Sequence, residues 1–205
     1  AGVPLTRGEG GTSRVLGDIG RGPSGASSFP PTRRAMANVF PEAFATMRIR
    51  PVHDYPRMLL AALRAAAPDG ASDPTVVVLT PGVFNSAYFE HALLARMMGV
   101  ELVEGRDLVC VGGQVRMRTT TGDRPVDVIY RRIDDEFLDP VHFRGDSILG
   151  VAGLVSSMRA GRVRQRFLVE LQAGGGGQLG EGLVDIDHLD RAHAERGGRL
   201  AVDAQ

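Results

Sequence analysis

TVVVLTPGVFNSAYFEHALLARMMGVELV, the stretch at residues 75–103, contains three structural signals in succession. The β-branched run Thr75–Thr80 is typical of a buried strand, and Asn85-Ser86 then opens an apolar-periodic helix that stops at Gly99. Val100–Val103 resumes as a strand. Strand, loop, helix and strand in this order form one βαβ unit, so the stretch predicts a parallel strand pair with a right-handed crossover.

Periodicity and turn signals extend this unit on both sides. The further expected elements are a helix from Pro56 to Ala66, a β-hairpin of Leu108–Val111 and Val115–Arg118 around Gly112-Gly113-Gln114, a strand at Val126–Tyr130 and a helix at Ile148–Arg159. The expected fold class is therefore α/β, with a mostly parallel sheet, flanking helices and one hairpin.

Composition divides the chain into three segments. Residues 1–50 form a Gly-rich N-terminal segment, and its first thirty residues are interpreted as loop because they hold few large apolar groups. Residues 51–163 contain the α/β core. Residues 164–205 combine a Gly-rich linker at 173–177 with a short polar helix expected at 187–195, and the sequence suggests no role for this tail.

The overall composition excludes several classes of function. The 205 residues carry a formal net charge of +0, which gives no general attraction to nucleic acid or to an anionic membrane. All 24 basic residues are arginine, so Schiff-base chemistry and a P-loop lysine are both excluded. The single Cys110, and the lack of an apolar run of about 20 residues, favour a cytoplasmic protein.

A dense cluster of charge, YRRIDDEFLDP at residues 130–140, follows the predicted strand that ends at Tyr130. Asp134 and Asp135 could bind Mg²⁺, which needs only one or two carboxylates beside phosphate and water oxygens, or they could cap a short helix. Arg131 and Arg132 could neutralise these acids as ion pairs or bind an anion bidentately. The residue pattern leaves both alternatives open.

The loop at residues 80–87 lies where open α/β sheets bind ligands, between the end of a strand and the start of a helix. Asn85 or Ser86 would serve there either as a helix N-cap or as a ligand contact. The histidines are isolated in sequence and are interpreted as surface or packed residues rather than general bases. The histidines of the core are His53, His91 and His142.

Several of these motifs resemble those of the circularly permuted ATP-grasp family. The resemblance is carried by VVVLTPGVFNSAYFEHALLA at 76–95, GVELVEGRDL at 99–108, MRTT at 117–120 and VIYRRIDDEFLDP at 128–140, and it extends from Arg33 to about Val163. Such proteins resemble carboxylate–amine ligases, in which ATP and Mg²⁺ activate a small-molecule or peptide carboxylate as an acyl phosphate for attack by an amine. The resemblance makes Arg131 and Arg132 candidate catalytic residues and makes Asp134 and Asp135 candidate metal ligands.

The same resemblance implies a set of cofactor-binding residues, some of them in an altered N-terminal motif. These candidates are Asp18, Arg21, Ser24, Arg33, Asn85 and Ser86. Where the family has Leu-Glu-Asp-Asn-x-Arg-x-Pro-Ser-Gly, this chain has LGDIGRGPSG at 16–25, so Gly17 and Ile19 replace two side chains that offer oxygen or nitrogen. A further departure is expected after Val163, where the family continues into lysine-containing ATP-grasp lobes.

These departures suggest that the chain is a truncated or frame-altered product of a larger ligase gene, and that it is inactive alone. A protein partner would then have to supply the missing lobes. The contrasting hypothesis is a non-catalytic binding or assembly module without ATP-grasp lobes.

Overall fold

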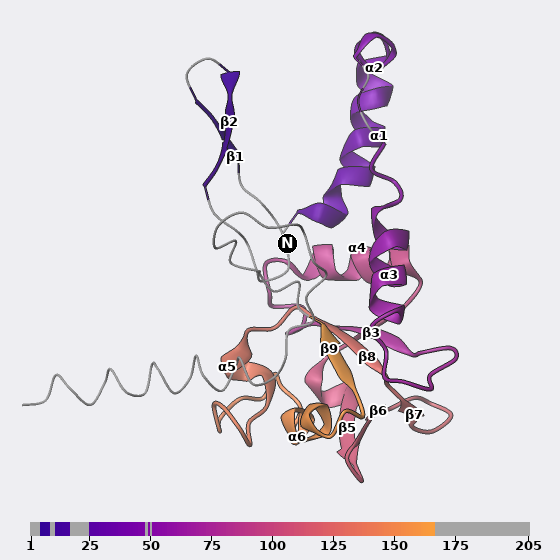
Figure 1. Ribbon diagram of the computed structural model, residues 1–205, viewed down its shortest axis with the longest axis vertical. Coiled ribbons are helices and arrows are strands. Elements are labelled where there is room, and N and C mark those ends of the chain that lie inside the picture. The colour runs from indigo at the N-terminus through magenta and orange to yellow at the C-terminus, as the bar shows by residue number, and fades with distance from the viewer. Residues whose placement is uncertain (1–4, 9–10, 17–24, 48, 50, 167–205) are drawn as a thin grey trace, which may run out of the picture.

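The computed structural model describes residues 5–8, 11–16, 25–47, 49 and 51–166. Its centre is a parallel sheet with the strand order β4-β3-β8-β9. The strands are β3 (Val76–Leu79), β4 (Glu101–Val103), β8 (Val128–Arg131) and β9 (Arg164–Arg166). Helix α4 (Tyr88–Met98) connects β3 to β4 (Figure 1), which confirms the predicted α/β class and the parallel pair.

Every residue of β3 is buried, which shows that both faces of the parallel sheet are covered at this strand. Val76 and Val78 pack against α3 (Tyr55–Arg64) and α4, whereas Val77 and Leu79 face the opposite side. Figure 1 shows α3 and α4 above the sheet and α6 below it. A central strand covered on both faces needs a continuous apolar run rather than alternation, and the sequence of β3 is such a run.

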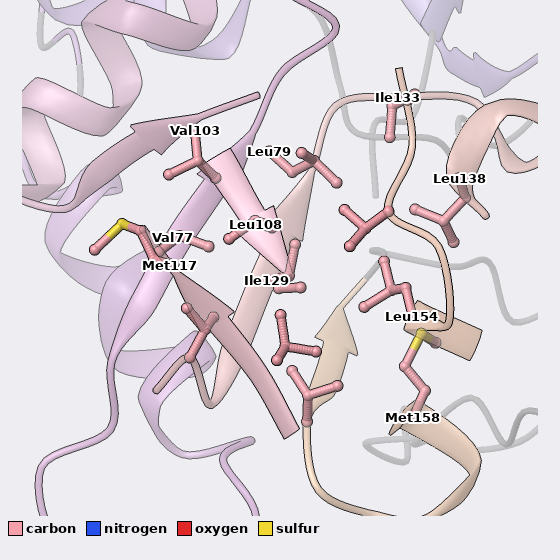
Figure 2. Packing of buried hydrophobic residues seen from close by; sticks show 14 residues of the cluster. Val77, Leu79, Val103, Leu108, Met117, Ile129, Ile133, Leu138, Leu154 and Met158 are labelled. Carbon is pink, nitrogen blue, oxygen red and sulfur yellow. The ribbon is translucent and has the colours of Figure 1, made fainter. Parts of the chain in front are cut away.

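The lower layer is an antiparallel sheet together with α6 (Leu154–Arg159). Its strands are β5 (Leu108–Val111), β6 (Gln114–Met117) and β7 (Arg124–Pro125), in that order. In Figure 2, Val77, Leu108 and Ile129 lie close together in the core between the two sheets. Gly112 and Gly113 form a two-residue turn with φ values of 59° and 78°, so the predicted hairpin is confirmed, with Gln114 in the strand.

The helix expected at Ile148–Arg159 begins only at Leu154. Tight backbone packing prevents an earlier start, because a Cβ at Gly150 would overlap the carbonyl oxygens of Phe137 and Leu138. The Val151 N–H also donates to the Leu138 carbonyl at 2.9 Å. Residues 148–153 are therefore held as a loop against the segment that contains α5 (Asp135–Leu138).

Asp139 is fully buried and holds this loop in place through hydrogen bonds to its backbone. Its Oδ1 accepts hydrogen bonds from the N–H groups of Val141 at 2.9 Å and Gly153 at 3.1 Å. Its Oδ2 accepts from the Val155 N–H at 2.9 Å and lies 3.1 Å from His142 Nδ1. Because two of these amides belong to the start of α6, Asp139 caps that helix from a distant position in sequence.

The N-terminal region contains more structure than the sequence predicted. Strands β1 (Leu5–Arg7) and β2 (Ser13–Val15) pair as a hairpin, and η2 (Ala26–Ser28), α1 (Phe29–Val39) and α2 (Pro41–Thr46) follow. The interpretation of the first thirty residues as loop is therefore wrong where these elements lie. The parallel sheet also continues past Val163 into β9. The linker at 173–177 and the helix expected at 187–195 lie outside the described residues.

Replacing Asp139 with alanine is expected to destabilise the fold by at least about 3 kcal/mol, because the N–H groups of Val141, Gly153 and Val155 lose the carboxylate that accepts from them. Equilibrium urea unfolding measures this loss as a lower midpoint. His142→Ala removes one contact of a side chain that is 24% exposed and should change stability by less than about 1 kcal/mol. Equal effects of the two substitutions would contradict this account of Asp139.

Gly150→Ala is expected to destabilise by about 3 kcal/mol or more, because the added methyl group meets backbone that cannot move aside as a side chain can. Gly145→Ala is the matched control, since its Cβ would have only the Pro140 carbonyl oxygen nearby, at 3.9 Å. Thermal unfolding of both variants compares the two sites. A Gly150→Ala protein as stable as the Gly145→Ala protein would refute the close packing.

Candidate functional site

A hollow of about 310 Å³ lies at the carboxyl end of the parallel sheet. Strands β3 and β8 pair in parallel, from Val76 opposite Val128 to Leu79 opposite Arg131. The segments that follow the two strands therefore meet at the carboxyl edge of the sheet. The polar residues that line the hollow come from these segments and from α4. They are Asn85, His91, Arg131, Arg132, Asp134 and Asp135.

The two adjacent arginines separate onto opposite sides of the sheet. The Arg132 N–H donates to the Leu79 carbonyl at 2.7 Å, so the alternation of β8 continues through this residue. Arg131 pairs with Asp135 at the start of α5, whereas Arg132 Nη2 lies 3.4 Å from Oε1 of Glu90 on α4. The exposed fractions of the two arginine side chains are only 3% and 6%.

Each buried guanidinium thus has a carboxylate from a different helix. This arrangement offsets part of the cost of removing the charges from water and fixes both side chains in position. Glu90, which is 12% exposed, was not predicted from the sequence. Its signal would have been a charged side chain in the first turn of a helix that follows a buried strand.

Two tyrosines surround the Arg132–Glu90 pair. Burial, followed by the neighbouring Tyr130, raises the pKa of Tyr55 to about 12. Burial also raises the pKa of Tyr130, against the opposing effect of Arg132. Both phenols are therefore neutral at physiological pH and add no charge next to the Arg132–Glu90 pair.

Of the two acidic residues expected to bind a metal or cap a helix, one occupies a capping position and the other forms an ion pair. Asp134 occupies the N-cap position of α5 but makes no capping hydrogen bond with its side chain. Asp135 is the ion-pair partner of Arg131. Among the described residues, no group of three or more His, Cys, Asp and Glu side chains could hold a metal ion. A cation at this edge would need further oxygen ligands from water or from a bound molecule.

The polar residues of the β3–α4 loop lie outside the helix that they were expected to begin. Helix α4 begins at Tyr88 with Ala87 as its N-cap, so the expectation that Asn85 or Ser86 caps it is wrong. Asn85 Oδ1 instead accepts from the Ala87 N–H at 2.9 Å, which forms a side-chain turn just before the helix. Asn85 lines the hollow, and Ser86 is not among its lining residues.

His91 lies in the wall of the hollow and is only 2% exposed. Its Nδ1 is 2.9 Å from the hydroxyl of Thr80, the residue that follows β3. Burial, followed by the positive charge of Arg132, lowers the pKa of His91 to about 4. The interpretation as a packed histidine is confirmed by its burial, but its contact with Thr80 was not foreseen.

The remaining candidate residues lie away from this hollow or outside the described residues. Arg33 is on α1, where its guanidinium lies 5.0 Å from the Phe44 ring centroid and donates to the Ile49 carbonyl at 2.9 Å. It is not among the residues that line the hollow. Asp18, Arg21 and Ser24 fall outside the described residues, so their assignment stays a prediction.

His91 should make the protein less stable in acid. Because its folded pKa of about 4 lies below its ordinary value of 6.5, the unfolded chain binds the proton first as pH falls. The contribution is complete above pH 6.5 and is lost between pH 6.5 and about 4, with a total of no more than about 3 kcal/mol. Urea unfolding across this range measures it. A His91→Gln protein should lack this portion of the pH dependence, and an unchanged pH profile would contradict the assignment.

Comparison with known proteins connects this geometry to a family. A family model described as a circularly permuted ATP-grasp matches residues 1–176, so the match continues past Val163, where the sequence resemblance was expected to end. An uncharacterized protein of Mycobacterium tuberculosis is 65% identical over 163 residues, which cover 80% of this chain and 30% of that protein. An uncharacterized protein of Synechocystis is 54% identical over 162 residues, which cover 79% of this chain and 34% of that protein.

The chain thus spans about a third or less of the length of these relatives. Within the described residues, no helix has the length and apolar character needed to cross a bilayer. The family model covers well over half of the chain, and it includes the whole hollow and both strands that build it. The chain therefore belongs to the circularly permuted ATP-grasp family.

Proposed function

We propose that this chain is the α/β portion of an ATP-dependent carboxylate–amine ligase and that the hollow binds the anionic end of a reacting molecule. The observation that supports this most directly is the pair of buried guanidiniums beside two carboxylates at the carboxyl edge of a parallel sheet. The substrates would be a small-molecule or peptide carboxylate and an amine. The net charge gives no reason to expect nucleic acid.

The residues of the hollow suit an activated carboxylate. ATP supplies a phosphoryl group that converts the carboxylate to an acyl phosphate, and the amine then displaces phosphate, which leaves with one oxygen of the original carboxylate. Arg131 and Arg132 would stabilise negative charge on the reacting oxygens, since they are held in place before a ligand arrives. Asn85 would add a neutral polar contact.

Asp134 and Asp135 fit the limited protein coordination that Mg²⁺ requires. Magnesium is commonly bound by one or two carboxylates and completes its octahedron with water and phosphate oxygens. Two carboxylates in the hollow match that donor set, and the lack of a larger acidic cluster among the described residues is compatible with it. The nucleotide-binding lysines of ATP-grasp lobes would come from sequence outside this lysine-free chain.

A second candidate function is an assembly module that binds another protein without chemistry. It is favoured by Phe84 in the β3–α4 loop and Phe89 in α4, which are 102% and 73% exposed. Aromatic side chains as exposed as these are enriched at protein contact surfaces. The same residues would equally serve to dock ATP-grasp lobes over the hollow.

The test uses the longer M. tuberculosis relative with ¹⁸O-labelled carboxylates from a panel of amino acids and short peptides. Ligation through an acyl phosphate places one ¹⁸O in the released phosphate, which ³¹P NMR detects. Alanine at the position aligned with Arg131 or Arg132 should slow this transfer about 100-fold or more, since each removes fixed charge from the reacting oxygens.

Alanine at the position aligned with Arg57 is the matched control, because that side chain is 79% exposed. It should leave turnover within about twofold of the parent. Released phosphate that never contains ¹⁸O would contradict the proposed ligase reaction. Unchanged turnover in both arginine variants would mean that these two residues form ion pairs with a structural role only.

A further inference from the structure

A short chain of hydrogen-bond contacts around Thr80 favours one tautomer of His91. The Gly82 N–H donates to Thr80 Oγ1 at 3.3 Å, and this hydroxyl lies 2.9 Å from His91 Nδ1. Thr80 is 1% exposed, so its O–H must donate to a protein group. Among the described residues, His91 Nδ1 is the acceptor that the contacts provide. This contact favours the tautomer in which Nδ1 accepts from the Thr80 hydroxyl and the hydrogen is on Nε2.

Because Nδ1 already contacts Thr80, a hydrogen bond from His91 to a ligand in the hollow has to come from Nε2. The two nitrogens lie on different edges of an imidazole, and the Nδ1 edge is occupied by Thr80. The same ring lines the hollow beside Arg131 and Arg132. A neutral ring of this tautomer offers an N–H donor and cannot accept a proton at that atom, so a general-base role for Nε2 is excluded.

We propose that His91 donates a hydrogen bond from Nε2 to an anionic oxygen, of a carboxylate or a phosphate, bound in the hollow. This inference rests on the proposed function, because it names a further binding contact of the same site. A neutral imidazole donor adds a directed contact without adding charge, and such donors stabilise oxyanions in other enzymes. The low pKa of His91 keeps the ring in this neutral state throughout the physiological range.

The tautomer is tested directly in the full chain labelled with ¹⁵N-histidine. The chain has 5 histidines, and the signals of His91 are identified by their loss in His91→Gln. We expect a protonated Nε2 and an unprotonated Nδ1 that do not titrate between about pH 5.5 and 8. Thr80→Val should abolish this preference because it removes the hydroxyl donor. A proton on Nδ1 in the parent chain would overturn the inference.

Binding is tested by calorimetry with inorganic phosphate and, separately, with acetate, both in a magnesium buffer. The comparison variant is Thr80→Val/His91→Phe, which replaces both hydrogen-bonding partners by apolar groups and so avoids a buried unpaired hydroxyl. This variant should bind the preferred probe about 10-fold or more weakly, whereas His91→Gln, which retains an N–H near the position of Nε2, should stay within about threefold. The two probes distinguish a phosphate site from a carboxylate site.

Arg132→Gln separates this inference from the proposed function. In one outcome, the parent chain binds a probe that Arg132→Gln no longer binds and that Thr80→Val/His91→Phe still binds. In that case the proposed role of His91 is wrong, and the anion site itself is supported. If the parent chain binds neither probe, the proposed site and the inference both fail. Loss of binding in both variants supports both.

Discussion

The parallel pairing of β3 with β8 is the constraint on which the site depends. Four consecutive residue pairs place the ends of the two strands at the same edge of the sheet, and the ladder continues through the Arg132 N–H to the Leu79 carbonyl. Alternation along β8 then sends successive side chains to opposite faces. Arg131 and Arg132 consequently meet carboxylates from different helices, and both arginines line the hollow.

The acidic segment after β8 divides into a part that faces the hollow and a part that supports it. Asp134 and Asp135 line the hollow, whereas Asp139 is buried and binds the backbone of the loop that leads to α6. The carboxylates look equivalent in sequence because they differ only in what lies near them after folding. Gly150 supports the same loop, since its backbone contacts the segment that carries α5.

Local patterns predicted the elements whose stability is local or strongly apolar. The buried run of β3, the glycine that ends α4 and the Gly-Gly turn of the hairpin each required only neighbouring residues. The start of α6 was missed because Asp139 and Gly150 determine it from other parts of the chain. Strand β9 was missed because a three-residue polar strand is recognised only by its pairing with β8.

The site was predicted in the same uneven way. Adjacent charges pointed to Arg131, Arg132, Asp134 and Asp135, which line the hollow, whereas Glu90 and His91 reach Arg132 and Thr80 only because α4 packs over β3. Their inclusion changes the electrostatics of the hollow. The formal charge of the group is −1 while His91 is neutral, because the three carboxylates of Glu90, Asp134 and Asp135 exceed the two arginines by one. An anion that arrives with a divalent cation is therefore better matched to this site than a bare anion is. Phosphate groups usually meet such carboxylates together with a divalent cation.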